Sequence, residues 1–282
     1  MKQAVKNLMY TIAPKWTTEL LSARARAHSQ RAIASWGSAR VTQKLLERFG
    51  DRVQSGPFAG LTLTRMTHAE QIGPFLLGVY ESELDKAWDL VLEGSYSHII
   101  DIGAKFGYYA VGLARRFPNT RVIAYDTDRW ARKAMLEMSA ENGTANLEVR
   151  SYCPPDVATQ LSGEPAFYIS DCEGYESALF RPEMIPHLRS ATLIIESHDD
   201  LVPGVSARLR SAFAESHAIL VLTTEGPRRV PDQPLPFLSE PEHSLATQEV
   251  RPPQTWLVCL PKTGPNQGLH VLDGAACKAE VA

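Results

Sequence analysis

Short apolar runs alternate with amphipathic segments through the middle of the chain. Seven runs have the length of a buried strand, and they cover residues 97–102, 121–125, 147–152, 166–170, 191–195, 218–223 and 255–260. Between the first six runs, apolar residues recur at helical spacing, as in the segments 108–117 and 128–142. Because strands that alternate with helices form parallel sheets, the pattern predicts an α/β fold with a largely parallel sheet.

The last two runs differ from the others, because no helical segment separates them. We expect these two strands to pair antiparallel and to complete a Rossmann-like sheet of seven strands. The core then covers residues 96–262, with a Pro-rich insertion at 226–253 that is too long for a simple turn. The remaining predicted segments are a basic helical arm at 1–50, a hairpin and helix at 51–95, and a flexible C-terminal tail at 263–282.

A glycine turn follows the first predicted strand. Gly103 and Gly107 bracket the turn, a helix follows it, and Asp126 stands just past the second strand. Glycine lets a ligand approach the backbone, and an acid in this place accepts hydrogen bonds from ribose hydroxyls. The turn lacks the third glycine of a dinucleotide fingerprint, and no Gly-Lys-Ser/Thr of a phosphate-binding loop follows. These features favour a ligand with ribose and adenine but no pyrophosphate, which points to S-adenosylmethionine.

Four motifs resemble those of a known family. DIGAKFGYY (101–109) resembles motif I of the class I methyltransferases, and SDCEGYE (170–176) resembles the D-x-E-G-x-E segment of FkbM-type methyltransferases. GVYE (78–81) and IIESH (194–198) resemble two further segments of that family, so the resemblance covers roughly residues 57–261. It implies a seven-stranded methyltransferase fold and an S-adenosylmethionine cofactor. The chain departs from the family at Lys105, where asparagine is more usual.

The predicted cofactor site gathers residues of the glycine turn and of the strand ends. Asp126 is expected to bind the ribose, and Asp156, after the third strand, is placed to bind the adenine amino group. The resemblance adds Tyr80 and Glu81, which would close over the cofactor. The full set is Asp101, Gly103, Ala104, Lys105, Gly107, Tyr108, Asp126, Asp156, Asp171, Tyr80 and Glu81.

Methyl transfer to a hydroxyl group requires a residue that takes the proton. His198 is the predicted base, because its ordinary pKa lies closest to neutral pH, and Asp171 and Glu173 are the predicted catalytic carboxylates. The alternative for His198 is a structural histidine bound by Glu196 or Asp199. A second alternative is a magnesium ion held by Asp171 and Asp199, since hard oxygen ligands suit Mg²⁺.

The function that these residues predict is O-methylation of a sugar, a glycan or another small hydroxylated molecule. A nucleic-acid acceptor is disfavoured, because the catalytic tetrapeptide N-P-P-[FY] does not follow the fourth strand and the net charge is −3. In this sheet order, the insertion 226–253 would form part of the acceptor wall. The alternatives are a noncatalytic adenosylmethionine-binding scaffold and an NAD-dependent oxidoreductase.

Charge is distributed unevenly along the chain. Residues 1–50 hold nine Lys/Arg and two Asp/Glu, a net charge of +7 that leaves −10 for the remainder. This arm is expected to be a solvated cap or a homo-oligomer contact, with peripheral contact to an anionic membrane as the alternative. No apolar run reaches the ~18 residues of a membrane span. The four cysteines show no C-x-x-C spacing, which is typical of reduced thiols in a cytoplasmic protein.

Overall fold

Seven strands form one mixed sheet at the centre of the computed structural model, which describes residues 38–69, 72–224, 231, 234–249 and 253–266. Their order across the sheet is β3-β2-β1-β4-β5-β7-β6. The last strand runs antiparallel to both of its neighbours, and the other pairs are parallel, which confirms the predicted sheet. The strands are β1 His98–Ile102, β2 Arg121–Tyr125, β3 Leu147–Arg150, β4 Phe167–Ser170, β5 Thr192–Ser197, β6 His217–Thr223 and β7 Thr255–Pro261.

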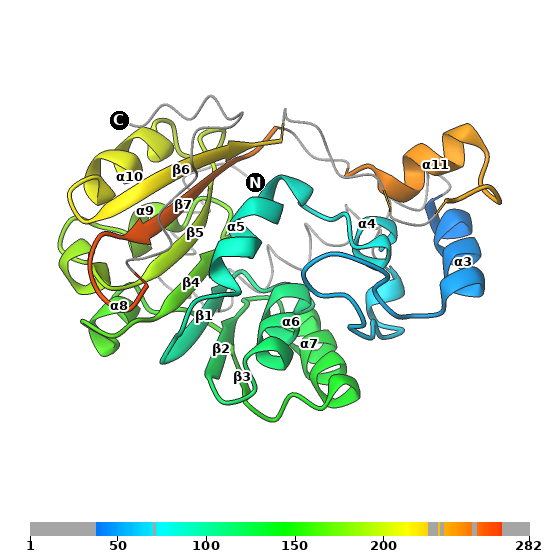
Figure 1. Ribbon diagram of the computed structural model, residues 1–282, viewed down its shortest axis with the longest axis horizontal. Helices are drawn as coiled ribbons and strands as arrows, with labels where there is room; N and C mark the ends of the chain where they lie inside the picture. Colours follow the sequence, from blue (N-terminus) through cyan, green and yellow to red (C-terminus); the bar gives the residue numbers. More distant parts are fainter. Residues whose placement is uncertain (1–37, 70–71, 225–230, 232–233, 250–252, 267–282) are drawn as a thin grey trace, which may run out of the picture.

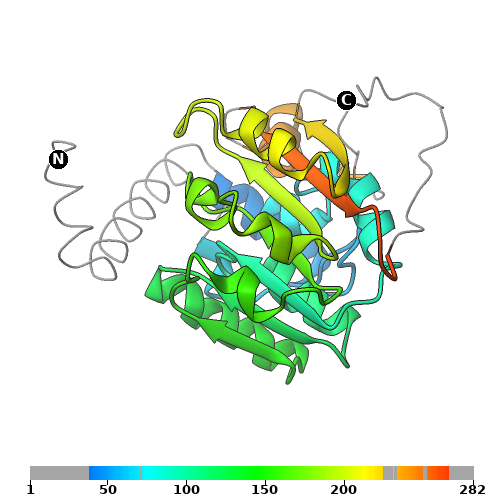
Figure 2. The same cartoon turned by 90° about the vertical axis from the view of Figure 1, so that its left-hand side faces the viewer.

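Helices cover both faces of this sheet (Figures 1 and 2). One face packs against α5 Asp85–Val91, α6 Tyr108–Arg116 and α7 Arg129–Asn142. The other packs against α8 Val157–Gln160, α9 Glu176–Leu179, the 3₁₀-helix η3 Ile185–Leu188 and α10 Val205–Phe213. Alternate residues of a strand point to opposite faces, so in β4 the side chains of Phe167 and Ile169 join one core while Tyr168 joins the other.

The register of the parallel strands determines which residues meet at their carboxyl ends. Ile102 lies beside both Tyr125 and Ser170, and Ser170 lies beside Ile195. The next residues along the chain after these four positions are Gly103, Asp126, Asp171 and Glu196. The glycine turn and three acidic residues therefore lie along one edge of the sheet, where open α/β sheets bind their ligands.

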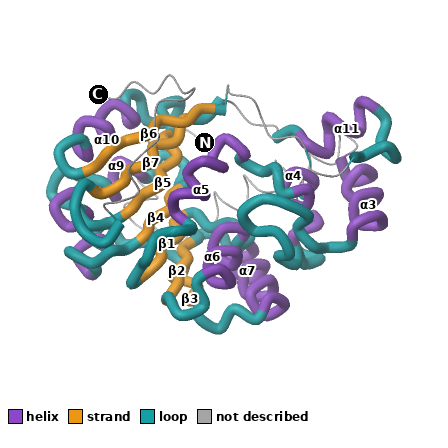
Figure 3. The backbone as a smooth tube through the Cα atoms, viewed as in Figure 1, coloured by secondary structure: helices purple, strands orange, loops and turns teal. Residues whose placement is uncertain are grey.

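Three helices from distant parts of the sequence lie together beside the sheet (Figure 3). They are α3 Ser38–Phe49, α4 Gly73–Leu77 and α11 Glu240–Thr247, and α11 packs on the other two. The sequence did not predict α11, which lies within the Pro-rich insertion. Lys44 donates to Glu242 at 2.7 Å, and Leu45 is fully buried. The described part of the predicted basic arm therefore packs one side against the core, through Val41 and Leu45, whereas residues 1–37 lie outside the described residues.

The segment before the sheet contains short elements. The predicted hairpin is reduced to a single bridge between Arg52 and Thr62. Two 3₁₀-helices follow, η1 Thr67–Ala69 and η2 Ser82–Leu84. Among the described helices, none has the length and apolar character that crossing a membrane requires. Cys153, Cys172 and Cys259 are free thiols, and Cys277 and residues 267–282 of the predicted tail lie outside the described residues.

Candidate active site

The glycine turn between β1 and α6 is tightly packed. Gly103 has a φ of +87°, and a Cβ at this position would lie 1.6 Å from the carbonyl oxygen of Asp171. Gly107 has a φ of +95°, and its Cβ would meet Met135 at 2.5 Å. Both positions therefore require glycine, for conformation and for space. Lys105, between them, donates its backbone N–H to Oδ2 of Asp126 at 2.8 Å and so ties the turn to the end of β2.

A buried carboxyl group lies directly before this turn. Asp101 is 3% exposed, and within the described residues its Oδ2 atom has no hydrogen-bond partner. Burial, and then the charges of Asp126, Asp171 and Glu81, raise the pKa of Asp101 well above its ordinary value. Glu81 is itself buried and accepts a hydrogen bond from the hydroxyl of Tyr109. Neighbouring acids thus disfavour ionisation of Asp101, and a cationic ligand at this end of the sheet would favour it.

Two backbone hydrogen bonds hold the carboxylate of Asp126. Besides the N–H of Lys105, it accepts the N–H of Asp128 at 2.7 Å through Oδ1. Burial raises the pKa of Asp126 to about 6, and the two backbone hydrogen bonds limit the rise. At pH 7 and above the group is therefore mostly ionised, and an ionised carboxylate acts only as a hydrogen-bond acceptor.

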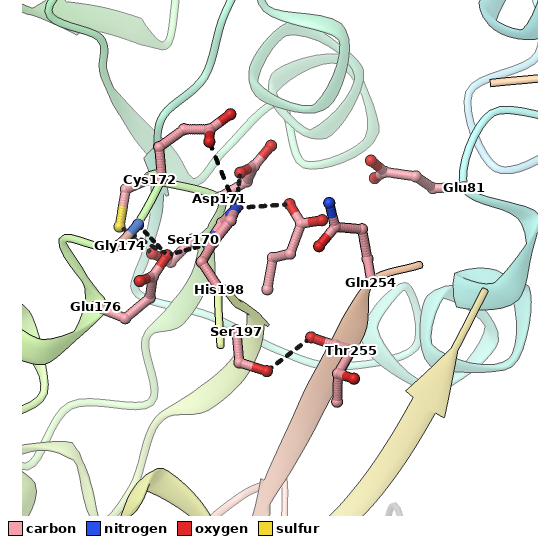
Figure 4. A network of polar contacts seen from close by, with 12 residues as sticks. Glu81, Ser170, Asp171, Cys172, Gly174, Glu176, Ser197, His198, Gln254 and Thr255 are labelled. Atoms are coloured by element: carbon pink, nitrogen blue, oxygen red, sulfur yellow. Dashed lines mark hydrogen bonds and ion pairs between the residues drawn. The ribbon is translucent and has the colours of Figure 1, made fainter. Parts of the chain in front are cut away.

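His198 lies just past β5, between two carboxylates (Figure 4). Its Nδ1 atom is 2.7 Å from Oε1 of Glu176, and its Nε2 atom is 3.4 Å from Oδ1 of Asp171. Two further carboxylates approach Nε2, Glu196 at 3.8 Å and Glu173 at 4.0 Å. Both ring nitrogens thus face acceptors, which is the environment of a doubly protonated imidazolium.

The charges of this cluster stabilise each other. Burial alone would lower the pKa of His198, but hydrogen bonds with Asp171 and Glu176 raise it to about 11. Burial alone would also raise the pKa of Asp171, but hydrogen bonds with His198 and Glu196 hold it below its ordinary value. In the free protein at neutral pH, His198 is therefore a cation, and Asp171 is the ionised carboxylate that faces it.

Backbone strain gathers at the same edge of the sheet. Within the described residues, the residues other than glycine with positive φ are Glu81 at 46°, Lys105 at 48° and Glu173 at 54°. A left-handed conformation costs about 1–2 kcal/mol for an L-residue with a Cβ atom. Three separate segments carry this cost at one place, and such strain is typical of functional sites.

Most of the predicted site residues meet at this edge, with some differences. Tyr80 stacks on Phe75 at 3.7 Å between ring centroids, next to the turn. Asp156 is exposed and directly precedes α8. The sequence reasoning missed Glu176 as a partner of His198, although the residue closes the SDCEGYE motif. The signal was available, because Glu176 stands among apolar residues of a short helix, where an acid needs a specific partner.

The predicted metal ligands correspond only partly to the structure. The described residues that bring ligating atoms within 4.8 Å of one another are Asp171, Glu196 and His198, and Asp199 does not belong to this group. Mg²⁺ prefers oxygen ligands in an octahedral arrangement. One of the three donors here is an imidazole nitrogen that faces carboxylates, so this donor set does not fit magnesium.

Comparison with known proteins gives similarity at low identity. No protein-family model matches the sequence, and no curated protein matches it either. One similar solved structure is that of the O-methyltransferase TomG from Streptomyces achromogenes, which is involved in tomaymycin synthesis and was solved with S-adenosylmethionine. It is 14% identical over 79% of this chain and 89% of its own, with a TM-score of 0.40. An rRNA methylase from Streptococcus thermophilus is 16% identical over 63% of this chain and 95% of its own, with a TM-score of 0.40.

An O-methyltransferase family protein from Burkholderia thailandensis is also similar, at 16% identity over 79% of this chain and 71% of its own, with a TM-score of 0.37. Identities and scores of this size identify no family and no substrate. The function is therefore argued from the residues of this chain.

Proposed function

We propose that the protein is an S-adenosylmethionine-dependent methyltransferase that acts on a hydroxyl group of a sugar, a glycan or another small molecule. The observation that carries the proposal is the buried acidic edge around a glycine turn. Asp101 has a buried oxygen without a partner among the described residues, and the charges of Glu81, Asp126 and Asp171 surround it. A ligand with positive charge and a ribose suits this edge, whereas the pyrophosphate of NAD would be repelled by it.

The residues present fit the cofactor. Asp126 would accept hydrogen bonds from the ribose hydroxyls, and Asp101 would pair with the ammonium group of the methionine part. The glycine turn leaves space for close approach of the ligand to the backbone. When bound, S-adenosylmethionine supplies a methyl group activated by a positively charged sulfur atom.

In this proposal, Asp171 takes the proton of the acceptor hydroxyl. Its carboxylate lies at the end of β4, is held ionised by His198 and is partly exposed. A carboxylate suffices as the proton acceptor, because a hydroxyl oxygen becomes much more acidic as it is alkylated. Glu173, whose side chain is 80% exposed, is the second predicted carboxylate and would bind other hydroxyls of the acceptor.

The cofactor half of the proposal is tested by calorimetry. We expect S-adenosylhomocysteine to bind with micromolar affinity and NAD not to bind. Asp126→Asn should weaken binding of both S-adenosylhomocysteine and methylthioadenosine, whereas Asp101→Asn should weaken only the former, because methylthioadenosine lacks the ammonium group. Asp89→Asn, an exposed acid on α5, is the matched control. Tight binding of NAD without S-adenosylhomocysteine would refute the proposal.

The transfer half is tested with labelled cofactor and a panel of hydroxylated acceptors. We expect Asp171→Asn to abolish transfer in a protein that still binds S-adenosylhomocysteine. Cofactor binding without transfer to any acceptor in the panel would instead favour a noncatalytic scaffold.

A further inference from the structure

Glu176 is a fully buried acid that the reaction described above does not use. Its exposed fraction is 0%, and it opens α9, a helix of four residues. The Oε1 atom accepts from His198 at 2.7 Å and also lies 3.5 Å from the Cys172 thiol and 3.4 Å from the backbone nitrogen of Gly174. Its position is thus determined by the loop that carries Asp171 and Glu173.

The contact with Glu176 decides how the imidazole ring of His198 is oriented. With Nδ1 at Glu176, the opposite nitrogen, Nε2, points toward Asp171 at the ligand-binding edge of the sheet (Figure 4). A ring turned by 180° about its χ2 axis would lose the 2.7 Å contact. Because His198 is 3% exposed, water cannot replace that contact easily.

We propose that Glu176 is a positioning residue for methyl transfer: it holds His198 through Nδ1, so that the charged ring presents Nε2 to Asp171 and orients the carboxylate that receives the acceptor proton. This inference rests on the proposed function for its effect on catalysis. It gives His198 the role of an oriented cation, paired with Asp171 at 3.4 Å, in place of the general base that the sequence predicts.

The charges around the ring agree with this role. The groups that face His198 are Asp171 and Glu173 from the loop after β4, Glu176 from α9 and Glu196 from β5. Burial opposes the charge of the ring, but the hydrogen bonds with Asp171 and Glu176 raise the pKa of His198 to about 11. Removal of the Glu176 charge should therefore lower this pKa toward the neutral range, while the other carboxylates remain.

The variant that tests the inference is Glu176→Gln, which keeps the size and one hydrogen-bonding oxygen of the side chain. The matched control is Glu164→Gln. Glu164 likewise contacts the Nδ1 atom of a histidine, that of His98, at 3.2 Å. This pair lies at the amino ends of β1 and β4, whereas the site lies at their carboxyl ends. The readouts are kcat, KM, affinity for S-adenosylhomocysteine, and the ring signals of His198 in a pH titration by NMR, assigned with His198→Gln.

We expect Glu176→Gln to lower kcat at least tenfold while KM and the S-adenosylhomocysteine affinity stay within about threefold. The His198 ring should remain protonated up to pH 9 in the native protein and should titrate below pH 9 in Glu176→Gln. Glu164→Gln should change neither. Glu176→Asp, which keeps the charge, should keep the ring protonated up to pH 9.

Two results would overturn the inference. One is a His198 ring that titrates near its ordinary pKa in the unaltered protein, a measurement that needs no variant. The other is an unchanged kcat in a folded Glu176→Gln protein that still binds S-adenosylhomocysteine. If the unaltered protein transfers no methyl group at all, the proposed function fails, and the NMR titration still decides whether Glu176 orients His198.

Discussion

Two histidines of this protein are almost equally buried and yet behave as opposites. His198 follows β5 and is 3% exposed, and His217 opens β6 and is 1% exposed. The pKa of His198 is raised to about 11, because the hydrogen bonds with Asp171 and Glu176 outweigh burial. The pKa of His217 is lowered, because burial is there the largest effect. Burial by itself therefore does not decide the charge of a histidine.

The difference lies in the partners that each edge of the sheet provides. His217 Nε2 donates to the carbonyl oxygen of Ala191 at 2.9 Å, and its Nδ1 lies 2.8 Å from the hydroxyl of Ser216. These neutral partners satisfy a neutral ring. His198 stands at the carboxyl ends of the parallel strands, where several acids lie together, and their carboxylates stabilise its charge. The comparison separates a histidine with charged partners from one with neutral partners.

The largest expected effect comes from replacing each histidine by glutamine. His198→Gln should lower kcat by about a hundredfold, because Asp171, the proposed proton acceptor, would lose the cation that holds it ionised and oriented. His217→Gln should leave kcat within twofold and lower the free energy of unfolding by about 1–2 kcal/mol, because a buried hydrogen bond is weakened. Steady-state kinetics and urea unfolding measure the two effects. Similar losses of kcat in both variants would show that His198 has no role in transfer that His217 lacks.

Asp126 is a third buried titratable group, and its titration tests the proposed cofactor site. The pKa of Asp126 is raised to about 6, mainly by burial. If its carboxylate binds the ribose, affinity for S-adenosylhomocysteine should fall as the pH drops below 6, and Asp126→Ala should weaken binding more than tenfold at pH 7.5. Calorimetry between pH 5 and 8 tests both. A pH-independent affinity would show that Asp126 does not contact the ligand.

The two histidines should also make the free energy of unfolding depend on pH in opposite directions. The raised pKa of His198 contributes stability that is complete below pH 6.5 and is lost as the pH rises toward about 11, by at most ~1.4 kcal/mol per pH unit. The lowered pKa of His217 makes the fold less stable as the pH falls below about 6.5. Urea unfolding between pH 5 and 9.5 should show that His217→Gln removes the acid dependence and His198→Gln the alkaline one. Dependences that persist in these variants must arise from other groups.

The smallest expected effect is that of a chelator. Because Nε2 of His198 faces carboxylates as a proton donor, excess EDTA should change transfer by less than twofold, and added magnesium should not increase it. The assay needs protein purified with and without chelator. Loss of activity that magnesium restores would show that a cation, and not the imidazolium, holds Asp171 and its neighbours.

Local patterns in the sequence were sufficient to predict the central sheet of this protein and the helices around it. Buried runs and helical spacing predicted the seven strands and the antiparallel last strand. The helix predicted over 128–142 is α7, which Asp128 caps at its N-terminus and Gly143, in the left-handed conformation, ends. The grouping of the acids at the strand ends was also predictable, because parallel strands bring their carboxyl ends to the same side of the sheet. The packing of α3 on α11 was not, because it joins Lys44 to Glu242, 198 positions apart.

Only the tertiary structure decided the chemistry of the site. The sequence indicated that His198 would lie beside acids, but it named Glu196 and Asp199 as partners, whereas the nearest carboxylate is that of Glu176. The left-handed conformations of Glu81, Lys105 and Glu173 were equally invisible, because they depend on contacts between separate segments. A pKa is the sum of burial and of every charge within a few ångströms, whatever their separation in sequence. For that reason the sequence could place an ionisable histidine at the edge of the sheet, but only the packed structure could make it a cation.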